Sequence, residues 1–310
     1  MRLTKLAVLG LLFLSLVATS TASAQRGAAR GRRAAAAQPR EGEDVASEPS
    51  VAAPTLEDLD TIVARMRTGT PDQVREAIDL MSVIDDPAVV PPLAELLRAG
   101  QSDTITDRAL EALRGLAHPS AIDVLVEFTH HRRAAARRRA YQALSAIQDR
   151  RVPTLVEHGL RDSDRTVRGA CALALGNMGA RGSLETLFRA FDRGVVEAAV
   201  AIGKLGDAAS VTRFGEELGR QPLSVMLSGY DQYLRRTDIP EQTKIDIVTR
   251  LGEISGRTVR EFLSQYLATF TERDRSRLRT VVQDTLRRIP IEGDTRRTVS
   301  ATAGESGGAQ

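Results

Sequence analysis

The chain has 310 residues, of which 42% are hydrophobic and only 4% aromatic, with no tryptophan. Its formal net charge of +3 falls to +1 when Arg2 and Lys5 of the first 24 residues are left out. A chain this close to neutral is not expected to bind nucleic acid or an anionic membrane through its overall charge. A core of Ala, Leu, Val and Ile favours closely packed helices. The single cysteine, Cys171, excludes an internal disulfide and a site built from several thiolates.

Residues 1–24 have the three parts of a secretory signal. Arg2 and Lys5 form a basic start, an apolar run extends from Leu6 to Val17, and Ala22-Ser23-Ala24 supplies small residues, which predicts cleavage after Ala24. The apolar run is shorter than the roughly 20 residues that span a bilayer. A cleaved signal is therefore favoured over an uncleaved membrane anchor, and the sequence predicts a periplasmic or secreted bacterial protein with no membrane span after cleavage.

Two further segments are predicted to be disordered. Residues 25–55 form a linker rich in Ala, Pro, Gly and charged residues, and residues 291–310 form a tail of similar composition. Such segments cannot bury enough apolar surface to offset the loss of chain entropy on folding. The folded part is therefore expected between these two segments.

An internal repeat occupies residues 73–220. Three apolar positions recur at successive intervals of 32, 31, 31 and 27 residues. The first position is small: Ala77, Ala109, Ala140, Cys171 and Ala198. The second and third are large: Met81, Leu113, Leu144, Leu175 and Ile202, then Ile84, Leu116, Ile147, Met178 and Leu205. Within one repeat these positions fall at i, i+4 and i+7, which is one face of an α-helix.

A turn and a second helix complete each repeat. The turns contain Pro87, Pro119, Gly179 and Gly206, residues that end or open helices. The second helices carry one large apolar residue each: Leu93, Leu125, Leu155, Leu187 and Phe214. A single helical hairpin cannot bury its apolar face alone, so the hairpins must stack into a solenoid. We expect a capping helix in 56–72 and a helical extension with looser repeats in 221–290, in which Leu223–Leu234 does not fit the register.

Two stretches carry a resemblance to a known family. Residues Val167–Phe188 and Val195–Phe214 resemble the HEAT-repeat family in its short bacterial form. The resemblance implies an all-α fold, an α-solenoid of stacked hairpins that forms a right-handed superhelix. It also implies that the second helix of each hairpin lines the concave face, which is the usual binding surface.

A row of acidic residues lies near the large residue of each second helix. Its members are Glu95, Glu127, Glu157 and Glu216, with Asp123 and Glu185 on the other side of their anchors. If the resemblance holds, these carboxylates make an acidic inner groove that attracts a basic partner. The alternative is that they are the solvated faces of amphipathic helices. The pattern leaves both open.

A basic run precedes the first helix of the third repeat. It contains Arg132, Arg133, Arg137, Arg138 and Arg139. Such a cluster could bind phosphate or an acidic partner. Single-stranded nucleic acid also needs aromatic platforms, and Tyr141 is the only ring nearby. We therefore favour a solvated ridge paired with acids of neighbouring repeats.

The remaining motifs predict neither a cofactor nor a metal. His118, His130, His131 and His158 are dispersed, and no HExxH run is present. The glycines of Gly176-x-x-Gly179-x-x-Gly182 close a helix instead of opening one, which is typical of helix ends and not of a phosphate loop. Cys171 occupies a small anchor position, which predicts a buried structural thiol.

These patterns favour an exported, non-catalytic scaffold that binds a protein or peptide partner along its concave face. The alternative is a HEAT-like enzyme, similar to a bilin lyase or acting on nucleic acid. The export signal and the lack of matching site residues disfavour it. A mechanical spacer with no defined ligand is the third possibility.

Overall fold

The computed structural model describes Thr55 and residues 58–254 and 256–289 of the chain. The predicted signal, the linker up to residue 54 and the tail from residue 291 lie outside these residues. Within the described part the chain forms 15 α-helices and no strand. The helices of the first half are α1 Leu59–Thr68, α2 Pro71–Ser82, α3 Val90–Arg98, α4 Asp103–Leu116, α5 Ile122–Phe128, α6 Ala134–Ala146, α7 Val152–His158 and α8 Arg165–Asn177. Those of the second half are α9 Leu184–Asp192, α10 Ala198–Leu205, α11 Ala208–Gly215, α12 Leu223–Arg235, α13 Glu241–Gly252, α14 Arg257–Leu267 and α15 Arg277–Arg288.

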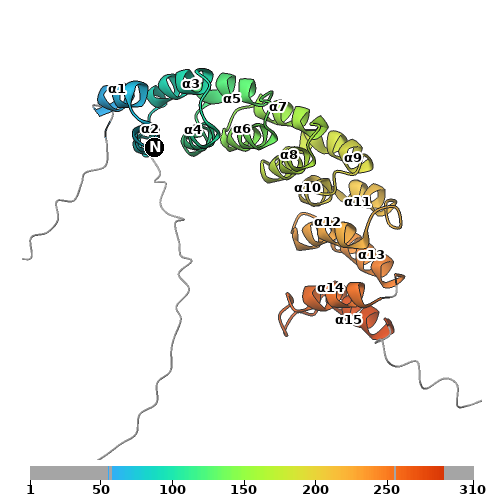
Figure 1. Cartoon of the computed structure of the whole chain (residues 1–310). Helices are drawn as coiled ribbons and strands as arrows, with labels where there is room; N and C mark the ends of the chain where they lie inside the picture. The colour runs from blue at the N-terminus through green and yellow to red at the C-terminus, as the bar shows by residue number, and fades with distance from the viewer. Residues whose placement is uncertain (1–54, 56–57, 255, 290–310) are drawn as a thin grey trace, which may run out of the picture. The chain divides into compact units, whose positions relative to one another are not determined.

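The helices of residues 58–289 stack in two layers (Figure 1). Helices α2, α4, α6, α8, α10 and α12 pack directly one against the next and form the inner layer, on the concave side of the stack. Helices α1, α3, α5, α7, α9 and α11 form the outer layer, where neighbouring backbones approach each other less closely. This arrangement confirms the predicted all-α solenoid. None of the described helices is long and apolar enough to cross a membrane.

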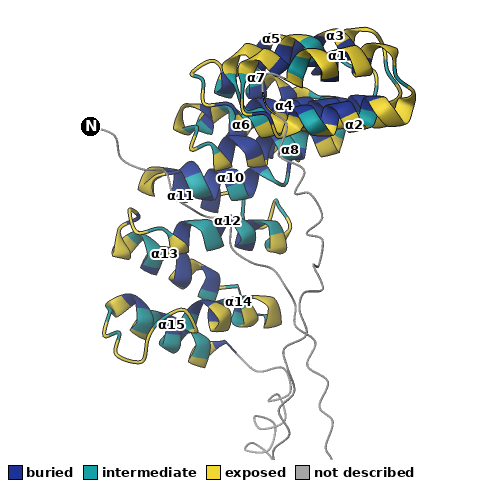
Figure 2. Ribbon diagram, turned by 90° about the vertical axis from the view of Figure 1, so that its left-hand side faces the viewer, coloured by how far each residue is buried: buried dark blue, intermediate teal, exposed yellow. Residues whose placement is uncertain are grey.

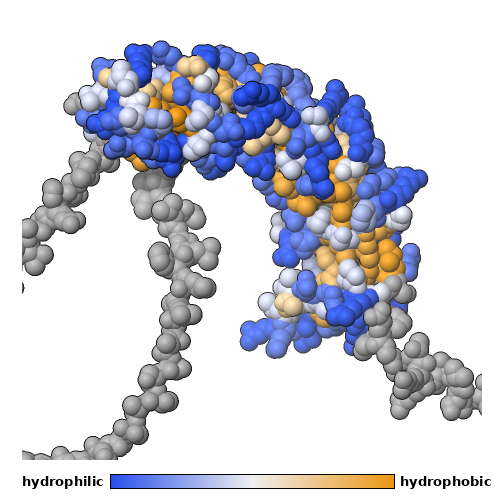
Figure 3. All heavy atoms as spheres, viewed as in Figure 1, coloured by the Kyte–Doolittle hydropathy of each residue, from blue (hydrophilic) through white to orange (hydrophobic). Residues whose placement is uncertain are grey.

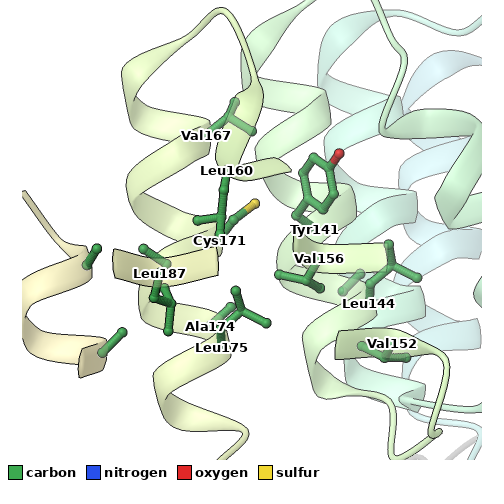
Figure 4. Close-up of a cluster of buried hydrophobic side chains, with 14 of the residues drawn as sticks. Tyr141, Leu144, Val152, Val156, Leu160, Val167, Cys171, Ala174, Leu175 and Leu187 are labelled. Carbon is green, nitrogen blue, oxygen red and sulfur yellow. The ribbon is translucent and has the colours of Figure 1, made fainter. Parts of the chain in front are cut away.

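The buried residues, dark blue in Figure 2, occur in the helices of both layers. All five residues of the small anchor row are fully buried, and those of the second row are at most 1% exposed. Figure 4 shows Cys171 among Tyr141, Leu144, Val156 and Leu187, which come from both layers. The repeat pattern in the sequence therefore marks the core correctly.

The boundaries of the helices follow from local hydrogen bonding. Thr70 caps α2, because its hydroxyl accepts from the Gln73 amide while the Gln73 side chain accepts from the Thr70 amide, and Pro71 fits the first helical turn. Pro87 and Pro119 each begin a short 3-10 turn, Pro87–Val89 and Pro119–Ala121, that leads into an outer helix. Prolines therefore open the second helix of these two hairpins.

A second row of small residues sets the close spacing of the inner layer. It lies one residue before the second anchor and consists of Ala112, Ala143, Ala174, Ala201 and Gly229. At two interfaces a glycine faces this row. A Cβ atom on Gly176 would lie 2.9 Å from the Ala201 Cα, and one on Gly203 only 2.3 Å from the Gly229 carbonyl oxygen. These small residues let neighbouring inner helices approach each other more closely than neighbouring outer helices do. The stack therefore curves, with the inner layer on its concave side.

Helix α12 continues the inner layer, against the prediction that Leu223–Leu234 falls outside the register. It packs on α10, and its buried residues Met226, Tyr230 and Tyr233 follow Ala198, Ile202 and Leu205 at a constant interval of 28 residues. A methionine stands at the small position and tyrosines at the aliphatic ones, which hid the repeat in the sequence. The larger side chains fit because Gly206 leaves space for the Tyr233 hydroxyl and Gly215 for the Tyr230 hydroxyl.

Helices α13, α14 and α15 end the described stack. Helix α15 packs against both α13 and α14. Arg260 of α14 donates hydrogen bonds of 2.7 and 2.8 Å to the carbonyl oxygens of Leu286 and Ile289 at the end of α15. The Arg260 guanidinium therefore satisfies carbonyl groups that have no partner within α15.

Candidate binding surface on the inner layer

The acidic row does not lie where the resemblance implied. Glu95, Glu127, Glu157 and Glu185 belong to α3, α5, α7 and α9, and these helices form the outer layer. The prediction that second helices line the concave face is therefore wrong. The first helices of the predicted hairpins are the ones that face inward.

Most acids of this row bind a neighbouring repeat. Arg67 donates to Glu95 at 2.7 Å, and Arg98 donates to both oxygens of Glu127 at 2.8 and 2.6 Å. Glu157 accepts from the Thr186 hydroxyl at 3.2 Å. The hydrogen bonds from Arg98 lower the pKa of Glu127 below its ordinary value. These carboxylates thus connect successive outer helices.

The other acids of the row have different surroundings. Arg213 of α11 donates to Glu185 at 2.6 Å and lowers the pKa of that carboxyl. Glu216 is exposed at the end of α11. Asp123 and Arg151 border an apolar hollow on the outer layer, between α5 and α7, whose floor contains Ile122, Val126 and Leu155. The six acids therefore do not form one continuous groove.

The basic run is largely engaged with acids of neighbouring repeats. Arg133 binds both oxygens of Asp107, Arg139 lies 3.3 Å from the same carboxylate, and Arg137 binds Asp162. Arg132 is exposed at the start of the run. Three of the five arginines thus form ion pairs with acids of neighbouring repeats, as the sequence predicted.

Arg138 differs from its neighbours. It lines a hollow of the inner layer and, unlike Arg133, Arg137 and Arg139, forms no ion pair with an acid among the described residues. The hollow has a volume of about 650 Å³, lies between α6 and α8, and reaches Glu197 at the start of α10. It is lined by Arg138, Gln142, Ser145, Arg165, Thr166, Gly169, Ala170, Leu173, Ala174, Asn177 and Glu197.

The hollow exists because α8 carries glycine at two of the positions where α4 carries charged side chains. Inward positions of α4 hold Asp107, Glu111 and Arg114, whereas the corresponding positions of α8 hold Gly169, Leu173 and Gly176, at twice the 31-residue spacing. The two glycines also allow α10 and the residue before it to pack closely on α8. A Cβ on Gly169 would lie 2.6 Å from the Glu197 carboxyl carbon, and one on Gly176 would lie 2.9 Å from the Ala201 Cα. Leu173 stands exposed to 38% in the hollow.

The charges of the hollow are not neutralised within the described structure. Arg138 and Arg165 form no side-chain ion pair there, and neither does Glu197. At the border, Lys204 donates to the Asn177 side-chain oxygen at 2.6 Å. By contrast, the inner surface of α2 and α4 satisfies its own charges: Arg108 binds Asp79 at 2.6 Å, and Arg114 binds Glu111. An open surface of mixed polar and apolar side chains is thus present in the middle of the inner layer.

Figure 3 shows a related trend on the visible face. Hydrophobic residues show through mainly between α8 and α13, while hydrophilic residues cover most of the surface over α1 to α6. A second hollow, of about 510 Å³, continues from the first toward the turn after α6 and shares Ser145, Ala174 and Asn177 with it. The candidate surface therefore extends along the junction of α6 and α8.

The other candidate residues of the sequence do not converge. His118 caps the 3-10 turn before α5 through the Ser120 amide, and His131 stacks on Phe128 at 5.5 Å between ring centroids. No group of three His, Cys, Asp or Glu side chains within the described residues could hold a metal ion. Gly179, with φ of 70°, lies just beyond α8, whereas Gly176 serves helix packing.

Cys171 is a buried thiol, as predicted from its place in the small anchor row. It is fully buried in the core of α8, and burial raises the pKa of the thiol well above its ordinary value. The Sγ atom lies so close to the α7–α8 connection that a Cβ on Gly159 would be 2.2 Å away. The thiol is therefore a packing group in this structure.

Sequence reasoning missed most residues of the inner hollow. Gln142, Arg165, Leu173, Asn177 and Glu197 lie between the anchors, and nothing in their type distinguishes them from other surface positions. A usable signal was the loss of long side chains at Gly169 and Gly176 in the otherwise regular pattern. Arg138 belonged to the predicted basic run, but its orientation was not predictable.

Comparison with known proteins supports the repeat architecture. Residues 90–176 and 122–203 match HEAT repeats. Both matches begin at the first residue of an outer helix, α3 or α5, and end within an inner helix, α8 or α10. No curated protein matches the chain in sequence.

Several solved structures match most of the chain at low identity. The chain is 17% identical to human deoxyhypusine hydroxylase, in complex with glycerol, over 75% of this chain and 96% of that one, with a TM-score of 0.37. It is 15% identical to the complex of CpcE and CpcF of phycocyanin lyase from Nostoc, over 81% and 100%, with a TM-score of 0.41. A designed armadillo repeat protein in complex with the peptide (KR)4 is 13% identical over 75% and 100%, with a TM-score of 0.36. Identities this low concern the fold alone.

Proposed function

Because the chain is a HEAT-repeat protein, we propose that it is an exported, non-catalytic scaffold that binds a protein or peptide partner on its inner layer. The observation that carries the proposal is the hollow between α6 and α8. It combines an exposed Leu173 with the unpaired arginines Arg138 and Arg165. Elsewhere, the charges on α2 and α4 are neutralised by their own neighbours.

The proposed site differs from the acidic groove suggested by the sequence. Four of those six acids are held by an arginine or a threonine of an adjacent repeat. A partner would have to break these contacts to use them. At the hollow, Arg138 and Arg165 form no ion pair within the described structure, so a partner can bind them without that cost.

Two features support binding over catalysis. Cys171 is buried and its pKa is raised, so the thiolate that a nucleophile requires is disfavoured. The candidate surface also holds no histidine. Export is supported by the sequence of residues 1–24 and is tested by intact-mass measurement of the mature protein, which should begin at Gln25.

Site-specific photo-crosslinking in cells tests the binding surface. A photoreactive residue at Gln142, exposed on inner helix α6, is compared with one at Thr212, exposed on outer helix α11. We expect a defined crosslinked partner from position 142 and not from position 212. The Leu173→Asp variant should abolish it. Crosslinks only from position 212 would contradict the proposed surface, and the lack of any crosslink would favour a mechanical spacer.

A further inference from the structure

We propose that the inner hollow recognises an acidic peptide segment in which carboxylate side chains flank a large apolar residue. The inference rests on the proposed function, because it assigns the ligand chemistry of the same surface. It reverses the charge of the partner that the acidic row suggested.

The positive charge of the hollow is the first support. Arg138 and Arg165 approach it from α6 and from the start of α8, and Glu197 is the one acid that lines it. Neither arginine forms a side-chain ion pair within the described structure, so both charges are available to a ligand. A carboxylate of the ligand would form charge-assisted hydrogen bonds with these guanidinium groups.

The neighbouring arginines show why Arg138 is different. Arg133 and Arg139 share Asp107 of α4, and Arg137 is held by Asp162 of the loop before α8. On α8, Gly169 occupies the position that corresponds to Arg138 one repeat later. No acid of α8 therefore faces Arg138. The Glu197 carboxylate lies over Gly169, and the hollow beside it, along Ala170 and Leu173, is open to a ligand.

The apolar part of the ligand follows from Leu173. This side chain is 38% exposed, and Ala170 and Ala174 on the same helix provide a smooth apolar surface beside it. Burying an apolar side chain of a ligand here would add binding free energy in proportion to the area covered. A bare polyanion would leave this surface uncovered.

The same residues argue against a nucleic acid. No aromatic side chain lines the hollow, so bases would have no ring on which to stack. Glu197 would also repel a continuous phosphate backbone, whereas a peptide can place a backbone amide near it. The combination of two arginines, one glutamate and one leucine fits a peptide with separate acidic and apolar groups.

Binding of defined peptides to the full chain tests this inference. Fluorescent peptides carry one leucine flanked by glutamates, glutamines or lysines, and a single-stranded oligonucleotide serves as a polyanion. We expect the glutamate peptide to bind tightest, and to weaken with added salt. Arg138→Gln and Arg165→Gln should each weaken it about tenfold, and Leu173→Ala should weaken it several-fold.

Two further variants provide the controls. Arg132→Gln removes an equal charge from the exposed start of the basic run. It should leave affinity within about twofold, because Arg132 does not line the hollow and an exposed charge is screened by salt. Arg138→Glu should transfer the preference to the lysine peptide.

Several results would overturn the inference. They are equal losses in Arg132→Gln and Arg138→Gln, oligonucleotide binding that is as tight as peptide binding and insensitive to Leu173→Ala, or the lack of any preference for glutamate. The proposed function fails separately. If position 142 crosslinks a partner whose contact segment is neutral or basic, the inner-layer site stands and the acidic-peptide inference does not.

Discussion

Arg137 and Asp162 are joined by two parallel hydrogen bonds, from Nε to Oδ2 and from Nη2 to Oδ1, each 2.7 Å long. The side chains are only 14% and 8% exposed. Arg137 also donates to the His131 carbonyl oxygen at 2.9 Å, so one guanidinium connects α6, the loop before it and the loop before α8. This contact links two successive repeats of the inner layer.

Removing the charge of Asp162 should destabilise the protein. The Asp162→Asn variant leaves the poorly hydrated Arg137 without its counter-ion, and we expect a loss of about 2 kcal/mol in the free energy of unfolding. Urea unfolding followed by circular dichroism measures it. The control is Arg287→Ala, which removes an exposed pair with Asp284 and should change stability by about 0.3 kcal/mol or less. Equal losses in the two variants would show that the Arg137–Asp162 contact is not special.

The same pair predicts a pH dependence. Burial acts to raise the pKa of Asp162, but the hydrogen bonds from Arg137 and from the Asp164 amide together outweigh it, so the pKa lies below the ordinary value of 3.8. A carboxyl with a lowered pKa stabilises the fold above its unfolded pKa, and this contribution is lost as the pH falls through the folded pKa. The stability difference between the natural chain and Asp162→Asn should therefore be largest near about pH 7 and shrink below about pH 4. A difference that grows on acidification would contradict the sign of this shift.

Close packing of α10 and α12 predicts opposite effects for two glycines. A Cβ on Gly203 would lie 2.3 Å from the Gly229 carbonyl oxygen, whereas one on Gly115, near the end of α4, would meet nothing within 4 Å. Gly203→Ala should therefore destabilise the protein by about 1–3 kcal/mol. Gly115→Ala should stabilise it by up to about 1 kcal/mol through helix propensity. Thermal unfolding of both variants measures the sign, and stabilisation by Gly203→Ala would show that the inner layer is not tightly packed there.

The sequence predicted the repeat because its buried residues recur with a helical period. The row that contains Ala140 and Cys171 is buried as expected. Two features were not predictable in this way. Met226 and Tyr230 preserve the spacing but not the residue type, so the sixth inner helix was not recognised. The direction of curvature depends on which of the two helix layers packs more closely. The spacing of apolar residues in the sequence does not specify which layer that is.

The site was harder to predict than the fold for a physical reason. Binding residues on a solenoid occupy solvent-facing positions, where packing does not constrain the residue type. Arg138 and Arg139 are adjacent in the sequence, yet one lines the hollow and the other binds Asp107. Side-chain partners from the next repeat decide this difference, and only the three-dimensional arrangement brings those partners together.

Burial of Cys171 predicts low thiol reactivity. Because burial raises its pKa and no solvent reaches the side chain, an aromatic disulfide reagent should react much more slowly with the folded chain than with the chain in urea. The Cys171→Ala variant, which restores the residue found at most of the other small anchors, should remain folded with a loss of about 1 kcal/mol. Rapid labelling of the folded protein would show that α8 opens readily or that the thiol is accessible.

Charge reversal on the outer layer distinguishes the two binding surfaces. A variant with Glu95, Glu127 and Glu157 changed to lysine would abolish partner binding if the acidic row formed the binding groove. These residues lie on outer helices, and Arg67 and Arg98 hold two of them at exposed sites. Such exposed pairs contribute little to stability. We therefore expect a folded protein whose crosslinking from position 142 is unchanged.

The matched inner-layer variant is Arg138→Gln combined with Leu173→Asp, which alters the hollow and leaves every outer ion pair in place. Because Arg138 forms no ion pair among the described residues and Leu173 is exposed, this variant should also fold, and circular dichroism checks both proteins. Loss of the crosslink in this variant alone assigns binding to the inner layer. Loss in the lysine variant alone would return it to the acidic row on α3, α5 and α7.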